Sequence, residues 1–215
     1  MKERGMIFNG EMVRAILDGR KTQTRRIMKP QPEPCPRGGH WWPSNVFKTM
    51  LHVEDEMQNG KGGWGGLVGD ACPFGAVGDR IWVRETWASG LSTKSTLAYR
   101  ATHKREDLED GFYDTIKWTP SIHMPRWASR ILLEITDVRV ERLNAISEED
   151  ARAEGIIDGG CLNCGEPEPC GCANPEPDAT DAFAYLWQSI YGQESWNADP
   201  WVWVIEFKRV EGGAA

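Results

Sequence analysis

The segment WVWVIEFKRV, residues 201–210, decides the fold because its apolar residues follow the two-residue period of a β-strand. Trp201, Trp203, Ile205 and Phe207 share one face of this strand, and we expect that face to lie on the core. Working back along the chain, the same kind of pattern predicts five further strands, at residues 6–8, KTQTRRI (21–27), RIWVRETW (80–87), 97–101 and RILLEITDVRVERL (130–143).

Three short helices are expected between these strands. Residues 10–18 carry an apolar stripe, with Asn9 as N-cap and Gly19 where a left-handed residue ends a helix. Residues 147–155 form a two-turn helix capped by Ser147, and residues 181–191 have the clearest helical spacing. Without a repeated βαβ unit, this set predicts an α+β fold: a small, mostly antiparallel β-barrel with short flanking helices.

Two stretches interrupt the regular pattern. Residues 29–77 are rich in Pro and Gly, and residues 157–179 are rich in Pro, Gly and Cys, so we interpret both as loop insertions. Because predicted strands lie near both ends, we expect residues 1–210 to form one domain in which the terminal strands pair, with residues 211–215 as a frayed tail.

Composition and charge exclude several classes of protein. The 215 residues carry a net charge of −7, so bulk attraction to nucleic acid or anionic membranes is absent and any such contact is local. Eleven tryptophans and a hydrophobic fraction of 40% exclude a disordered chain. No apolar run approaches the roughly 20 residues that span a bilayer, and no signal peptide is visible, so we expect a cytoplasmic protein that does not bind membranes.

The charge is unevenly distributed along the chain. Residues 1–30 hold eight basic residues against three acidic ones, whereas residues 141–200 hold two against thirteen. Either the basic end contacts phosphate, or the two ends attract each other within one fold.

The segment GRKTQTRR, residues 19–26, places four cations and several hydroxyl or amide groups at a helix-to-strand junction. It can bind phosphate, or it can activate a hydroxyl if neighbouring cations lower the pKa of Lys21 and make it a base towards Thr24. Strand alternation places these two residues on opposite faces unless Lys21 lies in the turn that Gly19 permits. A solvated basic strand end is the alternative.

These residues resemble the ASCH-domain family of the PUA-like superfamily. Its motif Gly-x-Lys-x-x-(Glu/Thr)-x-Arg is matched by Gly19, Lys21, Thr24 and Arg26, and the strand GDRIWVRE, the helix SEEDARAEG and the closing strand follow in order. The resemblance covers the expected barrel elements but not the two insertions. The stretches WTPSIHMPRWASRI (118–131) and LWQSIYG (186–192) also resemble the longer, prophage-borne members.

The resemblance implies an amidohydrolase that removes the acetyl group from acetylated cytidine without a catalytic cofactor. Thr24 is then the nucleophile, Lys21 its base, and Glu154 positions or protonates the leaving amine. Glu154 ends the helix 147–155, where the macrodipole disfavours a carboxylate, and a nearby Lys21 offsets that penalty.

Other ASCH proteins resemble RNA-binding proteins or ribonucleases, so a non-catalytic module that binds RNA is the alternative. In either case the partner is a modified nucleoside or RNA. Arg25 and Arg26 are candidate substrate or nucleic-acid contacts, and Trp118, His123 and Arg126 are candidates for a base-stacking pocket. Trp127 is expected to pack in the loop that closes one barrel end. The oligomeric state is left open.

Cysteine spacing suggests a structural zinc site. Cys161, Cys164, Cys170 and Cys172 lie within twelve residues, and four thiolates around zinc can organise a segment too small for a core. Free thiols are the alternative, because the single residue between Cys170 and Cys172 is unusual. Cys35, His40 and Cys72 can form a second metal site, but their spacing is uninformative and we interpret them as isolated residues.

The tryptophans divide into two sets. Five fall on predicted strands or a helix and are expected in the core, whereas six lie outside these elements, where they can contact a base: Trp41, Trp42, Trp64, Trp118, Trp127 and Trp196.

Overall fold

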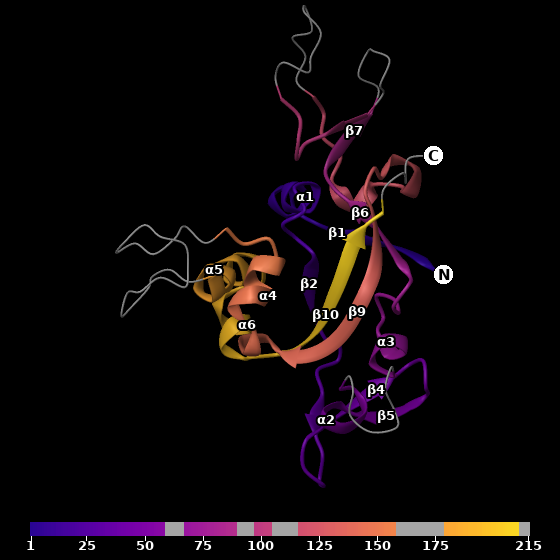
Figure 1. Ribbon diagram of the computed structural model, residues 1–215, viewed down its shortest axis with the longest axis vertical. Helices are drawn as coiled ribbons and strands as arrows, with labels where there is room; N and C mark the ends of the chain where they lie inside the picture. Colours follow the sequence, from indigo (N-terminus) through magenta and orange to yellow (C-terminus); the bar gives the residue numbers. More distant parts are fainter. Residues whose placement is uncertain (59–66, 90–96, 105–115, 158–178, 211–215) are drawn as a thin grey trace, which may run out of the picture.

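The computed structural model describes residues 1–58, 67–89, 97–104, 116–157 and 179–210. Their fold is α+β, as predicted, and its centre is a five-stranded sheet in the order β1-β6-β9-β10-β2 (Figure 1). β1 and β6 pair in parallel and the other neighbours pair antiparallel. The strands are β1 (Glu3–Ile7), β6 (Arg80–Arg84), β9 (Leu132–Arg142), β10 (Trp201–Arg209) and β2 (Gln23–Ile27).

The last of these strands in the chain, β10, lies inside the sheet with β9 on one side and β2 on the other. Its predicted apolar face is confirmed, because Trp203 and Ile205 are buried in the main core. The opposite face is buried as well: Val202 and Val204 pack in a second core with Phe183. β10 is therefore buried on both faces. Because β2 pairs with one edge of β10, this central strand holds β2 in place.

The described strands do not close into a barrel. The prediction that the terminal strands pair with each other is also wrong. β1 and β2 are the two edges of the sheet, and β1 pairs with β6 whereas β10 pairs with β9 and β2. Period-two patterns reveal strands but not their partners, so closure was an inference beyond the pattern. An Arg26 side chain on β2 links the two edges by donating to the Ile7 carbonyl of β1, at 2.9 Å.

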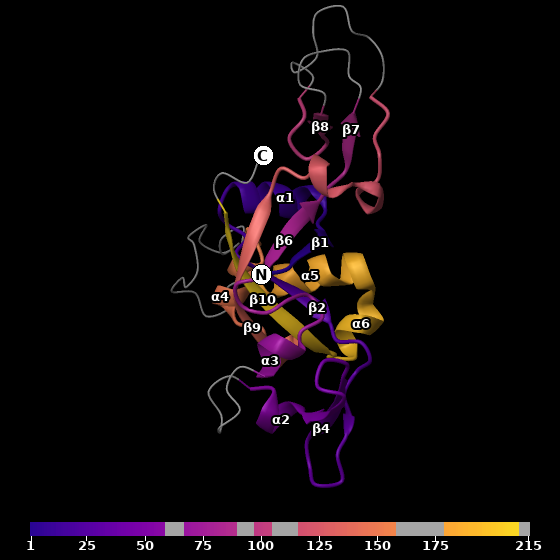
Figure 2. The ribbon, with the colours of Figure 1, turned by 90° about the vertical axis from the view of Figure 1, so that its right-hand side faces the viewer.

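The segment 29–77 was predicted to be an irregular insertion, and this was wrong for its described part. It contains a second sheet, β3 (Glu33–Pro34), β4 (His40–Ser44) and β5 (Thr49–His52), with helices α2 (Val53–Glu56) and α3 (Leu67–Ala71), at the lower end of Figures 1 and 2. These elements are two to five residues long, too short for a period to be visible among Pro and Gly. Trp42 joins the main core against Trp203, with ring centroids 5.4 Å apart, so it was wrongly placed outside the core.

A two-stranded hairpin, β7 (Trp87–Ser89) and β8 (Leu97–Tyr99), extends from the opposite end of the molecule (Figure 2). The short 3-10 helices Ser121–His123 and Arg126–Ala128 follow it. Trp127 was expected to pack in this loop, but it is 68% exposed, and its ring lies at 88° to that of Trp87 in a T-shaped contact.

The three predicted helices are confirmed as α1 (Gly10–Leu17), α4 (Glu148–Ala153) and α5 (Ala179–Tyr191); α6 (Gln193–Asn197) was not predicted. Asn9 and Ser147 accept the expected capping hydrogen bonds, and Gly19 has a φ of 77°. α4, α5 and α6 lie on one side of the main sheet (Figure 1). Within the described residues, no helix has the length and apolar character needed to cross a membrane.

Candidate active site

Lys21 and Glu154 meet where two helices end. α1 ends before Gly19, and the chain turns so that Lys21 lies ahead of β2 and forms an isolated antiparallel bridge with Glu154, the C-cap of α4. The Thr22 amide donates to the Ala153 carbonyl at 2.8 Å and continues this contact. Lys21 therefore lies outside β2, in an isolated bridge two residues after the turn at Asp18 and Gly19, so the strand alternation of β2 does not assign it a face.

The side chains of Lys21 and Glu154 form a buried ion pair. Lys21 Nζ is 2.6 Å from Glu154 Oε2 and 2.8 Å from the Glu154 carbonyl oxygen. The side chains are 0% and 3% exposed. Removing two charges from water costs several kcal/mol per ion unless pairing offsets it, so neither residue is tolerated here alone.

Burial is the largest influence on Lys21, and it lowers the pKa of this amine because it disfavours the ammonium form. The Glu154 carboxylate acts in the opposite direction, while the charges of Arg26 and Arg25 lower the pKa further. The pKa of Lys21 is thus lowered mainly by burial, and the neighbouring cations that the sequence analysis considered contribute less.

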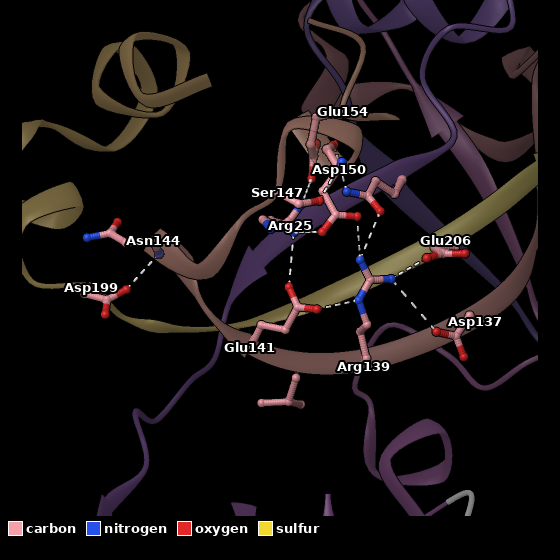
Figure 3. A network of polar contacts seen from close by, with 12 residues as sticks. Arg25, Asp137, Arg139, Glu141, Asn144, Ser147, Asp150, Glu154, Asp199 and Glu206 are labelled. Atoms are coloured by element: carbon pink, nitrogen blue, oxygen red, sulfur yellow. Dashed lines mark hydrogen bonds and ion pairs between the residues drawn. The ribbon is translucent and has the colours of Figure 1, made fainter. Parts of the chain in front are cut away.

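Arg25 connects this pair to a larger network, drawn in Figure 3. Its side chain is 1% exposed, and its guanidinium lies 3.4 Å from Glu154 Oε1, 3.1 Å from Glu141 Oε2 and 3.0 Å from Asp150 Oδ2. Three carboxylates from β9, α4 and its C-cap thus converge on one cation of β2. Arg25 was a candidate nucleic-acid contact, but a guanidinium buried among carboxylates is a structural centre.

Arg139 of β9 is the second cation of the network (Figure 3). It contacts Glu141 at 2.6 Å and Asp150 at 2.8 Å, and it also pairs with Glu206. Burial acts to raise the pKa of Asp150, but the charges and hydrogen bonds of Arg25 and Arg139 outweigh it and hold that pKa below its ordinary value. Arg139, Glu141, Asp150 and Glu206 were not predicted as site residues, although the alternation of charges in DVRVER (137–142) was a visible signal.

Thr24 lies on β2 opposite Ile205, and it is buried. Thr24 and Glu154 line the same small cavity of about 20 Å³, which lies between β2, Met12 of α1 and the apolar side of α5. A volume of this size has room for about one water molecule. The Thr24 hydroxyl forms no hydrogen bond with the described residues, including Lys21.

Two larger cavities adjoin the small one, and Met12 lines all three. The first, the mixed-charge cavity of about 450 Å³, includes Glu154 and carries both acidic and basic side chains: Glu11, Asp18, Arg14 and Arg20. The second, the arginine cavity of about 480 Å³, carries Arg26 and Arg84 among its lining residues. Either volume is in the range of a small-molecule site.

The proposed base-stacking residues lie elsewhere. Trp118 contacts His103 edge to face at 5.6 Å, His123 is exposed, and Arg126 pairs with Glu3 at 2.8 Å. None of the three lines a cavity that includes Thr24 or Glu154. The structure therefore brings together Lys21, Glu154 and, across the small cavity, Thr24, but not the aromatic group.

The predicted zinc ligands Cys161, Cys164, Cys170 and Cys172 lie outside the described residues. Elsewhere, Cys35 and Cys72 are free and buried, and burial raises the pKa of Cys72 to about 11. His40 pairs with Glu54 and not with these cysteines: its Nδ1 lies 2.6 Å from Glu54 Oε1. In the described part of the chain, no three His, Cys, Asp or Glu side chains form a group suited to a metal ion.

Comparisons of this chain with family models, curated proteins and solved structures give no match.

The backbone at Gly155 makes the Lys21 contact possible, which leads to a first prediction. Gly155 has a φ of 91°, and a Cβ there would lie 2.8 Å from the Ala15 Cβ and 3.0 Å from the Lys21 Cβ. We expect Gly155→Ala to lower the free energy of unfolding by about 1–3 kcal/mol, because it adds left-handed strain and a clash. Chemical denaturation measures this. Gly78→Ala is the matched control: its φ is 86° but no atom lies within 4 Å of the added Cβ, so it should cost less. Equal losses would contradict a close-packed Gly155.

Proposed function

We propose that this protein is an ASCH-type amidohydrolase with a PUA-like fold, which hydrolyses the linear amide of a modified nucleoside such as acetylated cytidine. The observation that carries the proposal is the buried pair in which Lys21 Nζ lies 2.6 Å from Glu154 Oε2, beside a cavity that Glu154 shares with Thr24. These are the three residues that the ASCH resemblance implies for catalysis.

The chemistry of the three groups is complementary. A lysine whose pKa is lowered by burial holds a larger fraction of neutral amine near neutral pH and accepts the proton of the Thr24 hydroxyl more readily. Thr24 Oγ1 attacks the acyl carbon, the bond from that carbon to the exocyclic nitrogen breaks, and the departing amine takes a proton. The 2.6 Å contact gives Lys21 and Glu154 a direct path for that proton. Water then hydrolyses the threonine ester and releases acetate.

Access to Thr24 requires a movement. Lys21 is bonded to Glu154 and not to Thr24, so its amine reaches the hydroxyl only by rotating its side chain or through one water molecule in the small cavity. Two α5 side chains separate the small cavity from its neighbours: Leu186 also lines the mixed-charge cavity, and Tyr191 also lines the arginine cavity. A substrate that enters from a larger cavity therefore has to displace them.

The test is incubation of the purified protein with acetylcytidine, with release of cytidine and acetate as the readout. We expect turnover by the wild type, and Thr24→Ser should retain a rate within about tenfold because serine keeps the hydroxyl. Thr22→Ser is the control on the neighbouring residue. No turnover by the wild type, together with RNA binding that weakens as salt rises, would favour the RNA-binding alternative instead.

A further inference from the structure

We propose that the arginine cavity is a phosphate subsite, so that a nucleotide, free or as a unit of RNA, binds in preference to the free nucleoside. This inference rests on the proposed function for the identity of the base, but the subsite itself follows from separate residues, Arg26 and Arg84. The cavity is adjacent to the small cavity because both are lined by Met12, Arg26, Ile190 and Tyr191.

The lining of the arginine cavity has one sign of charge. Among its described lining residues, Arg26 and Arg84 are the basic side chains, and no Asp or Glu is present. The mixed-charge cavity on the other side of Met12 instead has Glu11, Asp18 and Glu154. In a chain with a net charge of −7, a cavity with two cations and no anion selects for an anionic ligand.

Both guanidiniums are held in place without a carboxylate. Arg26 stacks over the Phe8 ring at 5.4 Å and donates to the Ile7 carbonyl, and Arg84 stacks over the Trp82 ring at 5.5 Å and donates to the Ile122 carbonyl. In the described part of the chain, neither forms an ion pair. An aromatic ring and a carbonyl orient each guanidinium but do not neutralise its positive charge. Two guanidinium groups held in this way can donate hydrogen bonds to the oxygens of a phosphate.

Arg84 also carries an unused donor. Its Nε is buried and has no hydrogen-bond partner in the described structure. A buried N–H without a partner costs about 1–3 kcal/mol. Arg80 Nε on the same strand is also buried without a partner, so it is the place of Arg84 in the cavity lining that assigns this residue to a ligand.

Gly5 on β1 is the residue that lets Arg84 take this position. A Cβ at Gly5 would lie 2.6 Å from the Trp82 ring and 3.0 Å from Arg84 Cδ. Gly5 pairs with Trp82 across β1 and β6, so its missing side chain allows the Trp82 ring to lie across the strand under the guanidinium. Gly5 therefore shapes the same wall of the cavity that it lines.

The position of the subsite fits the proposed reaction. Arg26 lies close enough to Lys21 for its charge to act on that amine, so the arginine cavity is near the catalytic pair. A nucleotide whose phosphate contacts Arg26 and Arg84 directs its base towards Thr24 and Glu154 in the small cavity. The arginines then bind the phosphate oxygens, while Thr24 and Glu154 contact the reacting amide. The negative charge of the phosphate is thereby kept away from the leaving amine.

Equilibrium binding tests the subsite independently of turnover. By calorimetry at low salt, we expect cytidine 5′-monophosphate or 3′-monophosphate to bind about tenfold or more tightly than cytidine. This preference should fall close to one in Arg84→Gln and persist in Arg80→Gln, a neighbour on β6 that does not line the cavity. A short RNA with one internal cytidine distinguishes a phosphodiester from a terminal phosphate.

The outcomes separate the two proposals. Equal affinity of the wild type for cytidine and for both monophosphates and the RNA overturns the phosphate subsite, even if acetylcytidine is hydrolysed. A phosphate preference that Arg84→Gln does not reduce also overturns it. A phosphate preference that depends on Arg84, in a protein that does not hydrolyse acetylcytidine, supports the subsite and contradicts the amidohydrolase.

Discussion

Replacing Lys21 by methionine is expected to lower kcat/KM for acetylcytidine by about a thousandfold, within the usual range for loss of a general base. Methionine fills the space of the lysine stem but cannot accept a proton. It also leaves Glu154 buried with Arg25 at 3.4 Å as its remaining charged partner, so we expect a loss of about 3–5 kcal/mol in the free energy of unfolding. Steady-state kinetics and chemical denaturation measure the two effects.

A double variant separates catalysis from stability. Lys21→Met with Glu154→Leu replaces the ion pair by two apolar side chains, and such replacements of buried pairs are often neutral or stabilising. We expect the double variant to regain most of the lost stability and none of the lost activity. A double variant as active as the wild type would remove both residues from the mechanism.

The pH profile gives a readout that a purely structural lysine would not change. Because the base works as the neutral amine, kcat/KM should rise with pH through the lowered pKa of Lys21. Glu154 acts to raise that pKa, so Glu154→Gln should move the rising limb to lower pH in whatever activity remains. If the rising limb of the kcat/KM profile stays at the same pH in Glu154→Gln, a group other than Lys21 controls it.

Replacing Arg25 by methionine is expected to destabilise the fold by about 3–5 kcal/mol at neutral pH. The reason is that Arg25 is buried and is the cation shared by Glu141, Asp150 and Glu154; without it, Arg139 still pairs with Glu141 and Asp150, but Glu154 loses its link to them. Chemical denaturation at pH 7 measures the change. Lys208→Met, which removes an exposed pair with Glu134, is the matched control and should leave the free energy of unfolding almost unchanged.

Acid should reduce the difference between wild type and Arg25→Met. The folded pKa of Asp150 lies below its ordinary value of 3.8, so its contribution to stability is present above that value and is lost as the pH falls through the folded pKa. Arg25 supplies part of that lowering. The stability gap should therefore be widest near neutral pH and narrow below about pH 4. A gap independent of pH would contradict an electrostatic role for Arg25.

Local features of the fold could be predicted from the sequence. Asn9 and Ser147 cap helices through bonds to residues three positions away, and Gly19 adopts its left-handed backbone at the end of α1. The strand alternation at residues 201–210 likewise depends only on neighbours. Patterns of this kind need no knowledge of tertiary partners.

Non-local features could not be predicted in the same way. No spacing in the sequence indicates that Arg25 meets Glu141 and Asp150, more than a hundred residues away. The partnership of Lys21 and Glu154 was expected only through the ASCH resemblance, and the opposite charges of residues 1–30 and 141–200 fit the network that joins them. The second sheet was missed because Trp42 and Leu51 contribute to the core from strands of four or five residues.

The inner position of β10 has a consequence for how the protein is made. The ribosome completes β2 about 170 residues before β10, yet β2 has no other sheet partner among the described strands. During synthesis, residues 23–27 must therefore wait with an unpaired edge until residues 201–209 emerge. Since β2 carries Thr24, the site proposed for catalysis is not assembled in the nascent chain until β10 inserts between β9 and β2.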